Sequence, residues 1–505
     1  MQNRVKWLCL AGTMFVALLL RLLGVAWGLP PAAPEVVASG LRGSYAFDED
    51  VILNGVAKAD VRRLDFDPHD YHWGTLHLEL VLLALDGAQT AGVFKASWRT
   101  SYYNLQEPDF TRVYVVGRLV AVATALLTIW LLFLFQETWA GAFAAMLVAV
   151  SPSHLLQSDQ VRVDVTMAAL LVLTLLVGVR AQKSGEPRQF FFLGIAAGLA
   201  IAGKYSAVPP VAAIALVALG LCRFPQRGVV AVAGGTLTGF LVGSPYFLIK
   251  PLSFLSAVHS YSFVHRAVPE RFQVPVGRLL ELHAANLIRF SMGLPAFLLA
   301  LVGIVWMLRR RSPSDWIILA AVVSYVAILV PLRWPLIRYD LPLTVLLGLC
   351  AGIALQQFPK RWAYPIAVTA LAMPLAGSIA QIDYMRSPAP ANLALQRILE
   401  VVPPGTPISR LGREEPPLDQ KVYPMGQNFL LDDLSQDPPK WVLTTSLPDP
   451  SPLPSTVSLL HSSYDEIAHI ESRRIFAWAT LGEADAPHDW KYTHPTFTLY
   501  RRRAQ

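Results

Sequence analysis

Acidic and imidazole side chains are concentrated in residues 44 to 77, a polar stretch between long apolar segments. It contains seven acidic residues and three histidines. Carboxylates in such a stretch can act as general bases, as metal ligands or as helix caps. Because binding and catalytic groups are often carried on loops held by a rigid scaffold, this stretch is predicted to form a reaction site.

Asp48 is the first candidate base. It precedes Val51, Ile52 and Val56, whose spacing predicts a short amphipathic helix lying along the membrane surface. Asp48 can cap that helix, and a cap would also fix the position of its carboxylate. Inverting glycosyl transfer needs a carboxylate to take the proton of the acceptor hydroxyl, and cations to stabilise the departing phosphate. Asp48 or Glu49 would meet the first requirement.

The segment from Asp65 to His72 is a second candidate region. Its carboxylates, Asp67 among them, and its histidines, His69 and His72, match the ligand preferences of divalent cations. The alternative is a hydrated loop, and we assign no metal here; a divalent cation stays a possible cofactor. A further acidic candidate, Asp164, lies at the outer start of a predicted helix, where it either caps the helix or reaches the site.

Several cations occupy places that membrane topology does not explain. A Lys or Arg at the centre of a membrane helix costs about 2.5 to 3.5 kcal/mol on insertion scales. Several such charges facing outward predict an anionic ligand, and a lipid phosphate would satisfy Lys204 and Arg338 together. The alternatives are snorkelling to headgroups, pairing of Arg338 with Asp340, and pairing of Arg162 with Asp159 on one helix face. The residues concerned are Arg21, Arg162, Lys204, Arg333 and Arg338.

The composition sets the class of protein. Of 505 residues, 54% are hydrophobic and only 15% are charged, and the mean hydropathy is +0.44. These values predict a polytopic membrane protein. The net charge of +7 comes from short Lys and Arg clusters between apolar runs, and no basic face with interleaved aromatic residues indicates nucleic-acid binding. Cys9, Cys222 and Cys350 lie in apolar segments, which excludes a disulfide framework and a Cys-x-x-Cys site.

Apolar runs of near-spanning length predict about eleven transmembrane helices in residues 1–380. The positive-inside rule places the N-terminus in the cytoplasm, and the first loop, 28–111, on the extracytoplasmic side of the plasma membrane. The runs are 7–27, 112–135, 140–157, 164–180, 190–203, 205–222, 228–248, 289–308, 315–332, 339–357 and 362–380.

Residues 381–505 are predicted to form a small extracytoplasmic α/β domain. Asn392 to Val401 has the apolar spacing of a helix, whereas Lys440 to Thr445 and Thr496 to Tyr500 have the composition of short strands. The predicted fold is therefore an all-α membrane bundle with a small C-terminal α/β domain.

Several motifs, in this order, resemble those of the GT-C class of membrane glycosyltransferases, specifically the protein-mannosyltransferase and aminoarabinose-transferase-like group (glycosyltransferase family 39). The resemblance extends over roughly residues 7 to 380, and the C-terminal run from His494 to Arg501 resembles the ending of many bacterial members. The family often has Leu at the position of Asp340 and Asn at that of Asp67. The matching motifs are Phe47-Asp48-Glu49, Asp67-Pro68-His69, Gly117-Arg118, Arg162-Val163-Asp164, Gly203-Lys204-Tyr205 and Arg338-Tyr339-Asp340-Leu341-Pro342.

This resemblance implies a transferase that moves a sugar from a polyprenyl-phosphate donor in the bilayer to a protein, lipid or glycan hydroxyl. It implies inversion at the anomeric carbon, with Asp48 as the base, alongside Glu49 and Asp164 as catalytic candidates. Phosphate binding falls to Lys204, Arg338, Arg333 and Arg162, and substrate contacts to Asp67, His69, His72 and Tyr205. A transporter or flippase of polyprenyl-linked sugars is the alternative, because it would use the same cations without needing the acidic loop.

Overall fold

The computed structural model describes most of the chain, in the ranges 3–29, 44–46, 48–99, 105–135, 139–266, 274–411, 425–428, 438–446, 454–471, 474–476, 479–480, 486–491 and 493–503. Phe47 of the acidic motif lies outside these ranges. The chain divides into two compact units. The first comprises Met1–Val25, Val51–Phe94 and Val113–Ile382, and the second comprises Ala26–Asp50, Lys95–Arg112 and Asp383–Gln505.

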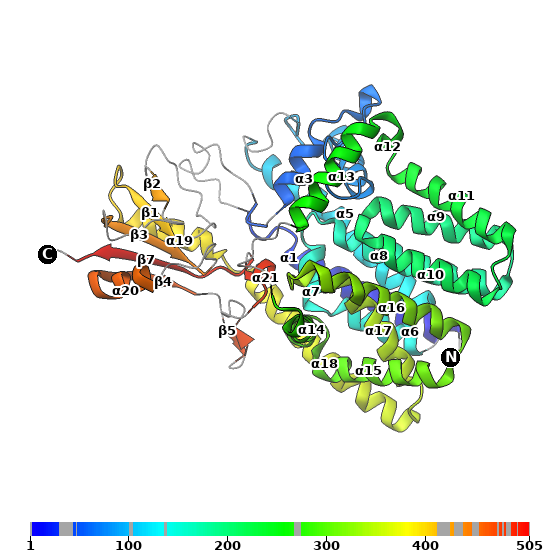
Figure 1. The fold of residues 1–505 in the computed structure, drawn as a ribbon. Helices are drawn as coiled ribbons and strands as arrows, with labels where there is room; N and C mark the ends of the chain where they lie inside the picture. The colour runs from blue at the N-terminus through cyan, green and yellow to red at the C-terminus, as the bar shows by residue number, and fades with distance from the viewer. Residues whose placement is uncertain are drawn as a thin grey trace. The chain divides into compact units, whose positions relative to one another are not determined.

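The first unit is built from helices (Figure 1). A short 3-10 turn, η3 (Tyr205–Ala207), precedes α10, and a π-helix, η5 (Leu287–Met292), joins α14 to α15. The helices of this part of the chain are α1 (Asn3–Gly24), α3 (Glu49–Val56), α4 (Leu76–Thr90), α5 (Asp109–Phe135), α6 (Trp139–Ala149), α7 (Pro152–Ser158), α8 (Val163–Ser184), α9 (Pro187–Gly203), α10 (Val208–Leu221), α11 (Gln226–Gly243), α12 (Tyr246–Ile249), α13 (Pro251–Arg266), α14 (Val276–Asn286), α15 (Gly293–Arg310), α16 (Pro313–Leu332), α17 (Ile337–Leu355) and α18 (Lys360–Met385).

Each of the apolar runs predicted from the sequence is helical over most of its length. Among the residues that the structure describes, seven helical segments are long and apolar enough to cross a membrane, and two more, Pro187–Gly203 and Tyr205–Leu221, are apolar but shorter. Of the other predicted runs, two form these shorter helices and two are divided by breaks. One break precedes Pro152, which lies in the first turn of α7, where the missing N–H of a proline is tolerated. The chain is a multi-pass membrane protein.

Local signals explain where several helices begin and end. Ser312 and Asp315 form a capping box at the start of α16, with Pro313 in its first turn. α8 ends at Gly185, which has a φ of 68° and so takes the left-handed conformation that favours glycine. These signals act within a few residues, so they can be read from the sequence.

Close helix contacts hold α9, which carries Lys204 at its end, between α8 and α11. A Cβ atom at Gly194 would lie 2.3 Å from the carbonyl oxygen of Val232, and one at Gly239 would lie 2.2 Å from that of Ile195. Only glycine allows the backbones of α9 and α11 to approach this closely. On its other side, α9 packs against α8, most of whose residues are buried. The end of α9 is therefore fixed by packing.

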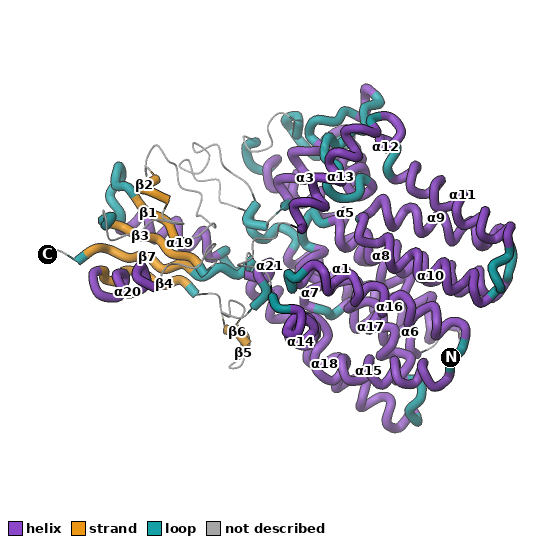
Figure 2. The backbone as a smooth tube through the Cα atoms, viewed as in Figure 1, coloured by secondary structure: helices purple, strands orange, loops and turns teal. Residues whose placement is uncertain are grey.

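The second unit contains a five-stranded mixed sheet with strand order β2-β1-β3-β7-β4 (Figure 2). β1 pairs in parallel with β2 and β3, and β7 pairs antiparallel with β3 and β4. The helix and strands predicted from the sequence are confirmed in α19, β3 and β7. The elements are α19 (Pro390–Val401), β1 (Ile408–Leu411), β2 (Met425–Asn428), β3 (Trp441–Thr445), α20 (Pro454–Ser463), β4 (Tyr464–Ile470), β5 (Arg474–Phe476), β6 (Ala479–Thr480), α21 (His488–Lys491) and β7 (Phe497–Arg502).

His494, in the C-terminal motif, is a core residue of the second unit. Its ring lies 4.7 Å from that of Trp490 and 4.3 Å from that of Tyr384, measured between centroids. Burial lowers the pKa of His494 to about 3, so the imidazole is neutral near pH 7. This histidine packs against the aromatic rings of the unit's core.

Candidate functional site

Lys204 and Asp164 form a buried ion pair in the first unit. Lys204 follows the last residue of α9 in extended conformation, and its Nζ lies 2.5 Å from Oδ1 of Asp164 in the first turn of α8. Both side chains are less than a tenth exposed. Asp164 therefore contacts Lys204, and its place in a reaction site stays a prediction.

Arginine side chains add positive charge around this pair. The ring of Tyr339 lies near two cations: its centroid is 5.2 Å from Nζ of Lys204 and 5.5 Å from Cζ of Arg338. Burial lowers the pKa of Lys204; the carboxylate of Asp164 opposes this, and the charges of Arg338 and Arg162 lower the pKa further. We call Lys204, Arg338 and Arg162 the cation cluster. Cations of this kind form charge-assisted hydrogen bonds to phosphate.

A cavity of about 100 Å³ opens beside Lys204. Two residues predicted to contact substrate, His72 and Tyr205, line it together with Lys204. The other lining residues come from the loop before α4, from η3, from α16 and from the start of α17. They are Trp73, Ser206, Tyr325, Ile328, Leu329, Leu332 and Tyr339.

A larger cavity, of about 560 Å³, lies among α1, α6, α17 and α18. It is beside Leu355, at the end of α17 opposite Arg338, and its lining is almost wholly apolar. Lys360 is the one charged residue in that lining. Size alone would favour this cavity, but catalysis needs convergent polar groups, so we place the candidate site at the smaller cavity.

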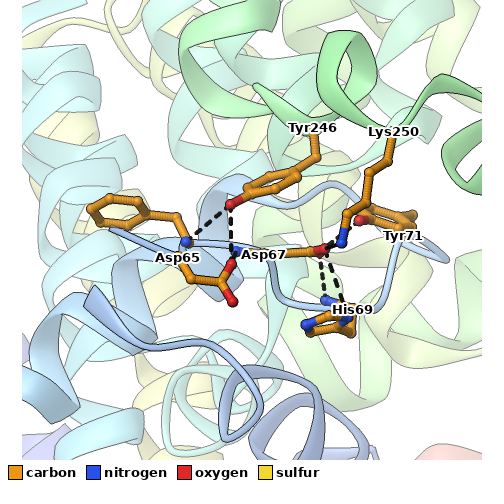
Figure 3. Close-up of polar contacts among 7 residues, drawn as sticks. Asp65, Asp67, His69, Tyr71, Tyr246 and Lys250 are labelled. Atoms are coloured by element: carbon orange, nitrogen blue, oxygen red, sulfur yellow. Dashed lines mark hydrogen bonds and ion pairs between the residues drawn. The ribbon is translucent and has the colours of Figure 1, made fainter. Parts of the chain in front are cut away.

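The acidic loop is fastened by residues that sequence reasoning missed (Figure 3). The carboxylate of Asp67 is fully buried; its Oδ2 lies 2.5 Å from Nζ of Lys250, and its Oδ1 accepts a 2.6 Å hydrogen bond from the hydroxyl of Tyr71. Tyr246 Oη accepts a hydrogen bond from the amide of Phe66 and donates one to Asp65. We call these contacts the loop clasp. The only hint of Lys250 in the sequence is its place at the outer end of an apolar run.

The two histidines of this segment remain outside the clasp's centre. The exposed His69 places Nδ1 3.6 Å from Oδ2 of Asp67, and His72 places Nδ1 2.7 Å from Asp70. Among the described residues, no group of three or more His, Cys, Asp or Glu side chains has a geometry suited to a metal ion. The carboxylates of the loop are engaged by Lys250, by tyrosines and by backbone amides.

The loop clasp lies next to the cation cluster. The hydroxyl of Tyr205, adjacent to Lys204, donates a 3.1 Å hydrogen bond to the carbonyl of Tyr71. Gly74 packs so closely on the end of α9 that a Cβ atom there would lie 1.9 Å from the carbonyl oxygen of Ala202. Any larger residue at position 74 would displace one of the two segments. The acidic loop and Lys204 are therefore positioned by the same contacts.

Protonation of Asp67 should loosen this clasp in acid. Burial raises the pKa of Asp67, but the hydrogen bonds from Lys250, Tyr71 and the His69 amide outweigh it, so the pKa lies below its ordinary value. A carboxyl with a lowered pKa contributes stability above its unfolded pKa and loses it as the pH falls through the folded pKa. We expect Asp67→Asn to unfold at a lower temperature than the parent at pH 7, with the difference shrinking below about pH 4.

Thermal unfolding of the detergent-solubilised protein between pH 3 and 7 measures this effect. Asp70→Asn is the matched control, because Asp70 lies in the same loop and contacts His72 instead of the clasp. An equal, pH-independent change in both variants would show that the Asp67 contacts do not stabilise the loop.

Asp48 and Glu49 belong to the second unit. Glu49 is fully buried, and its Oε2 accepts a 2.5 Å hydrogen bond from the hydroxyl of Ser44. Asp48 is partly exposed and has a φ of 74°, a conformation uncommon for residues other than glycine, asparagine and aspartate. The predicted amphipathic helix begins immediately after it, as α3. That Asp48 and Lys204 share one cavity stays a prediction.

The remaining predicted cations have different surroundings. Arg162 Nε donates a 2.9 Å hydrogen bond to Gln160, and its charge acts on Lys204. Arg333 is exposed where α16 ends. Arg21 is fully buried, and its guanidinium contacts the carbonyls of Ala17 and Ala149 and the ring of His154. These contacts give Arg21 a structural role in fixing α1.

The helices, the buried ion pair and the clustered cations define the class: a multi-pass membrane protein with a charged site at one end of its bundle. Residues 107–248 match the family model described as dolichyl-phosphate-mannose-protein mannosyltransferase, PMT_2. The resemblance predicted from the sequence motifs is confirmed over this part of the chain. The match identifies a membrane glycosyltransferase that takes its sugar from a lipid phosphate.

The solved structures with similar backbones include proteins from two organisms. The apo oligosaccharyltransferase of Archaeoglobus fulgidus is 13% identical, with a TM-score of 0.49, and the alignment covers 88% of this chain and 70% of that one. ArnT from Cupriavidus metallidurans, bound to undecaprenyl phosphate, is 15% identical, with a TM-score of 0.48 and coverage of 99% and 98%. A comparison with curated protein sequences finds no match.

Proposed function

We propose that this protein transfers a sugar from a polyprenyl-phosphate donor to an acceptor hydroxyl, with inversion at the anomeric carbon. The observation that carries the proposal is a cavity lined by Lys204, a lysine on which the charges of Arg338 and Arg162 also act. A donor phosphate beside this lysine would form charge-assisted hydrogen bonds with it.

Lys204 and Arg338 hold the donor phosphate in this proposal. Before the donor binds, Asp164 stabilises the lysine; when the phosphate arrives, it adds negative charge beside Nζ and the neighbouring guanidinium groups. As the glycosidic bond breaks, charge develops on the leaving phosphate oxygen, and fixed cations stabilise that charge without reorganising. Arg162 adds to the positive field at the lysine.

Asp48 is the proposed base, with Glu49 as a second carboxylate. Asp48 accepts the proton of the acceptor hydroxyl as the oxygen attacks the anomeric carbon from the face opposite the phosphate. The hydrogen bond from Ser44 holds Glu49 in place, and its neighbour Asp48 stays partly exposed. The extracytoplasmic location of this chemistry follows from the distribution of Lys and Arg between the apolar runs.

Donor consumption tests the function directly. Purified protein incubated with polyprenyl-phosphate sugars and candidate acceptors is expected to release free polyprenyl phosphate, which mass spectrometry detects. Reconstituted protein that moves the lipid-linked sugar across vesicles without releasing polyprenyl phosphate would identify a carrier and overturn the proposal.

A further inference from the structure

A buried cluster behind the cation cluster has no role in the proposed chemistry so far. Nδ1 of His283 lies 2.6 Å from Oδ1 of Asp340, and the amide of Asn286 donates a 3.1 Å hydrogen bond to Oδ2 of the same carboxylate. All three side chains are at most 5% exposed. Asp340, like Asp67, is also a position where the sequence differs from the family that it resembles, which often has leucine at position 340.

His283 and Asn286 can bind one carboxylate because of their spacing. They are three residues apart in α14, so they lie on the same face of that helix. Immediately after Asn286 the helix widens into the π-helix η5. Such π-turns are frequent at functional sites. The end of α14 therefore presents two hydrogen-bond donors to the first turn of α17.

The first turn of α17 needs such support. Pro342 has no N–H to donate to the carbonyl of Arg338, so one backbone hydrogen bond of the turn is missing. Outside contacts hold the segment instead. Asn286 also donates to the carbonyl of Pro335, and the hydroxyl of Tyr325 donates to the carbonyl of Tyr339. The contacts at Pro335 and Asp340 bracket Arg338.

Electrostatics add a reason for this support. Arg338 and Lys204 lie near the same ring, that of Tyr339, and carry like charges. Their charges repel one another, and the repulsion is stronger in a site of low dielectric constant than in water. A weakly held first turn would let Arg338 move away, and the anion site would then have to be rebuilt at each binding event.

We propose that His283 and Asn286 are positioning residues, which act through Asp340 to hold Arg338 and Tyr339 at the cavity before the donor binds. The donor-binding part of this inference rests on the proposed function. The buried carboxylate of Asp340 needs hydrogen-bond donors, and His283 supplies one. A leucine at position 340 would need none. His283, Asn286 and Asp340 thus form one hydrogen-bonded unit.

Hydrogen–deuterium exchange and kinetics test the proposal together. In His283→Ala, exchange of amides in residues 336–341 is expected to rise, and the KM for a polyprenyl-phosphate sugar to rise about tenfold or more, with a smaller change in kcat. His283→Asn should restore both values toward the parent, because the asparagine amide nitrogen occupies the place of Nδ1. Thr174→Val is the control, since Thr174 is also buried but bonds only within α8.

The two readouts separate this inference from the proposed function. Unchanged exchange at 336–341 in His283→Ala, or no rescue by asparagine, would overturn the positioning role whatever the activity. A second outcome is increased exchange in His283→Ala and its reversal in His283→Asn, in a protein that never releases polyprenyl phosphate. This outcome would support the positioning role and contradict the proposed function. The double variant His283→Leu/Asp340→Leu should exchange less than Asp340→Leu alone, because the imidazole of His283 is then no longer a buried donor without its acceptor, and only Asn286 loses a contact with the carboxylate.

Discussion

Asp48→Asn is expected to lower kcat by about 10² to 10⁴, the usual loss when a positioned general base is removed. Asparagine has nearly the same shape as aspartate and tolerates the positive φ of 74° at this position. The variant should therefore fold, and it should bind the lipid donor as the parent does. Release of polyprenyl phosphate measures turnover, and native mass spectrometry measures the retained donor.

Asp50→Asn is the matched control for this experiment. Asp50 lies two residues later, is also partly exposed, and accepts a long hydrogen bond from the amide of Ser44. Its replacement should change kcat by less than about threefold, since we assign Asp50 no part in proton transfer. Parental turnover by Asp48→Asn, or equal losses in both variants, would remove Asp48 from the role of base.

Lys204→Met should raise the KM for the donor by about tenfold to a hundredfold. The substitution keeps most of the apolar stem and removes the charge-assisted hydrogen bonds to phosphate, which are worth about 1.5 to 3 kcal/mol. It also leaves Asp164 buried without its lysine, so the unfolding temperature should fall. Donor titration and thermal unfolding are measured on the same detergent-solubilised preparation.

Asp164→Asn distinguishes a binding lysine from a purely structural ion pair. It breaks the same pair, so it should also lower the unfolding temperature, but it leaves the Lys204 side chain in place, and a bound phosphate supplies the negative charge that Asp164 supplied. Donor affinity should then equal or exceed that of the parent. Equal losses of donor affinity in the two variants would show that the pair only holds α8 against α9.

Much of the architecture could be predicted because its signals are local. Apolar run length predicted the helices, and short runs of β-forming residues predicted β3 and β7, which pair with each other. Charge placement singled out Lys204 and Arg338 from the many cations of the chain. Pro152 was a visible signal that the 140–157 run would divide, yet run length alone assigned it a single helix.

The amino-acid sequence by itself determined the class of protein, the helical segments and the candidate charges, because hydropathy, periodicity and charge placement are properties of neighbouring residues. Only the tertiary structure decided which charges meet. Lys204 pairs with Asp164 across 40 residues, His283 with Asp340 across 57, and Lys250 with Asp67 across 183. Such pairs depend on which helices pack together. For α9, the packing depends on close glycine contacts and on the end of the helix before Lys204. These features leave no periodic signal in the sequence at the positions that pair.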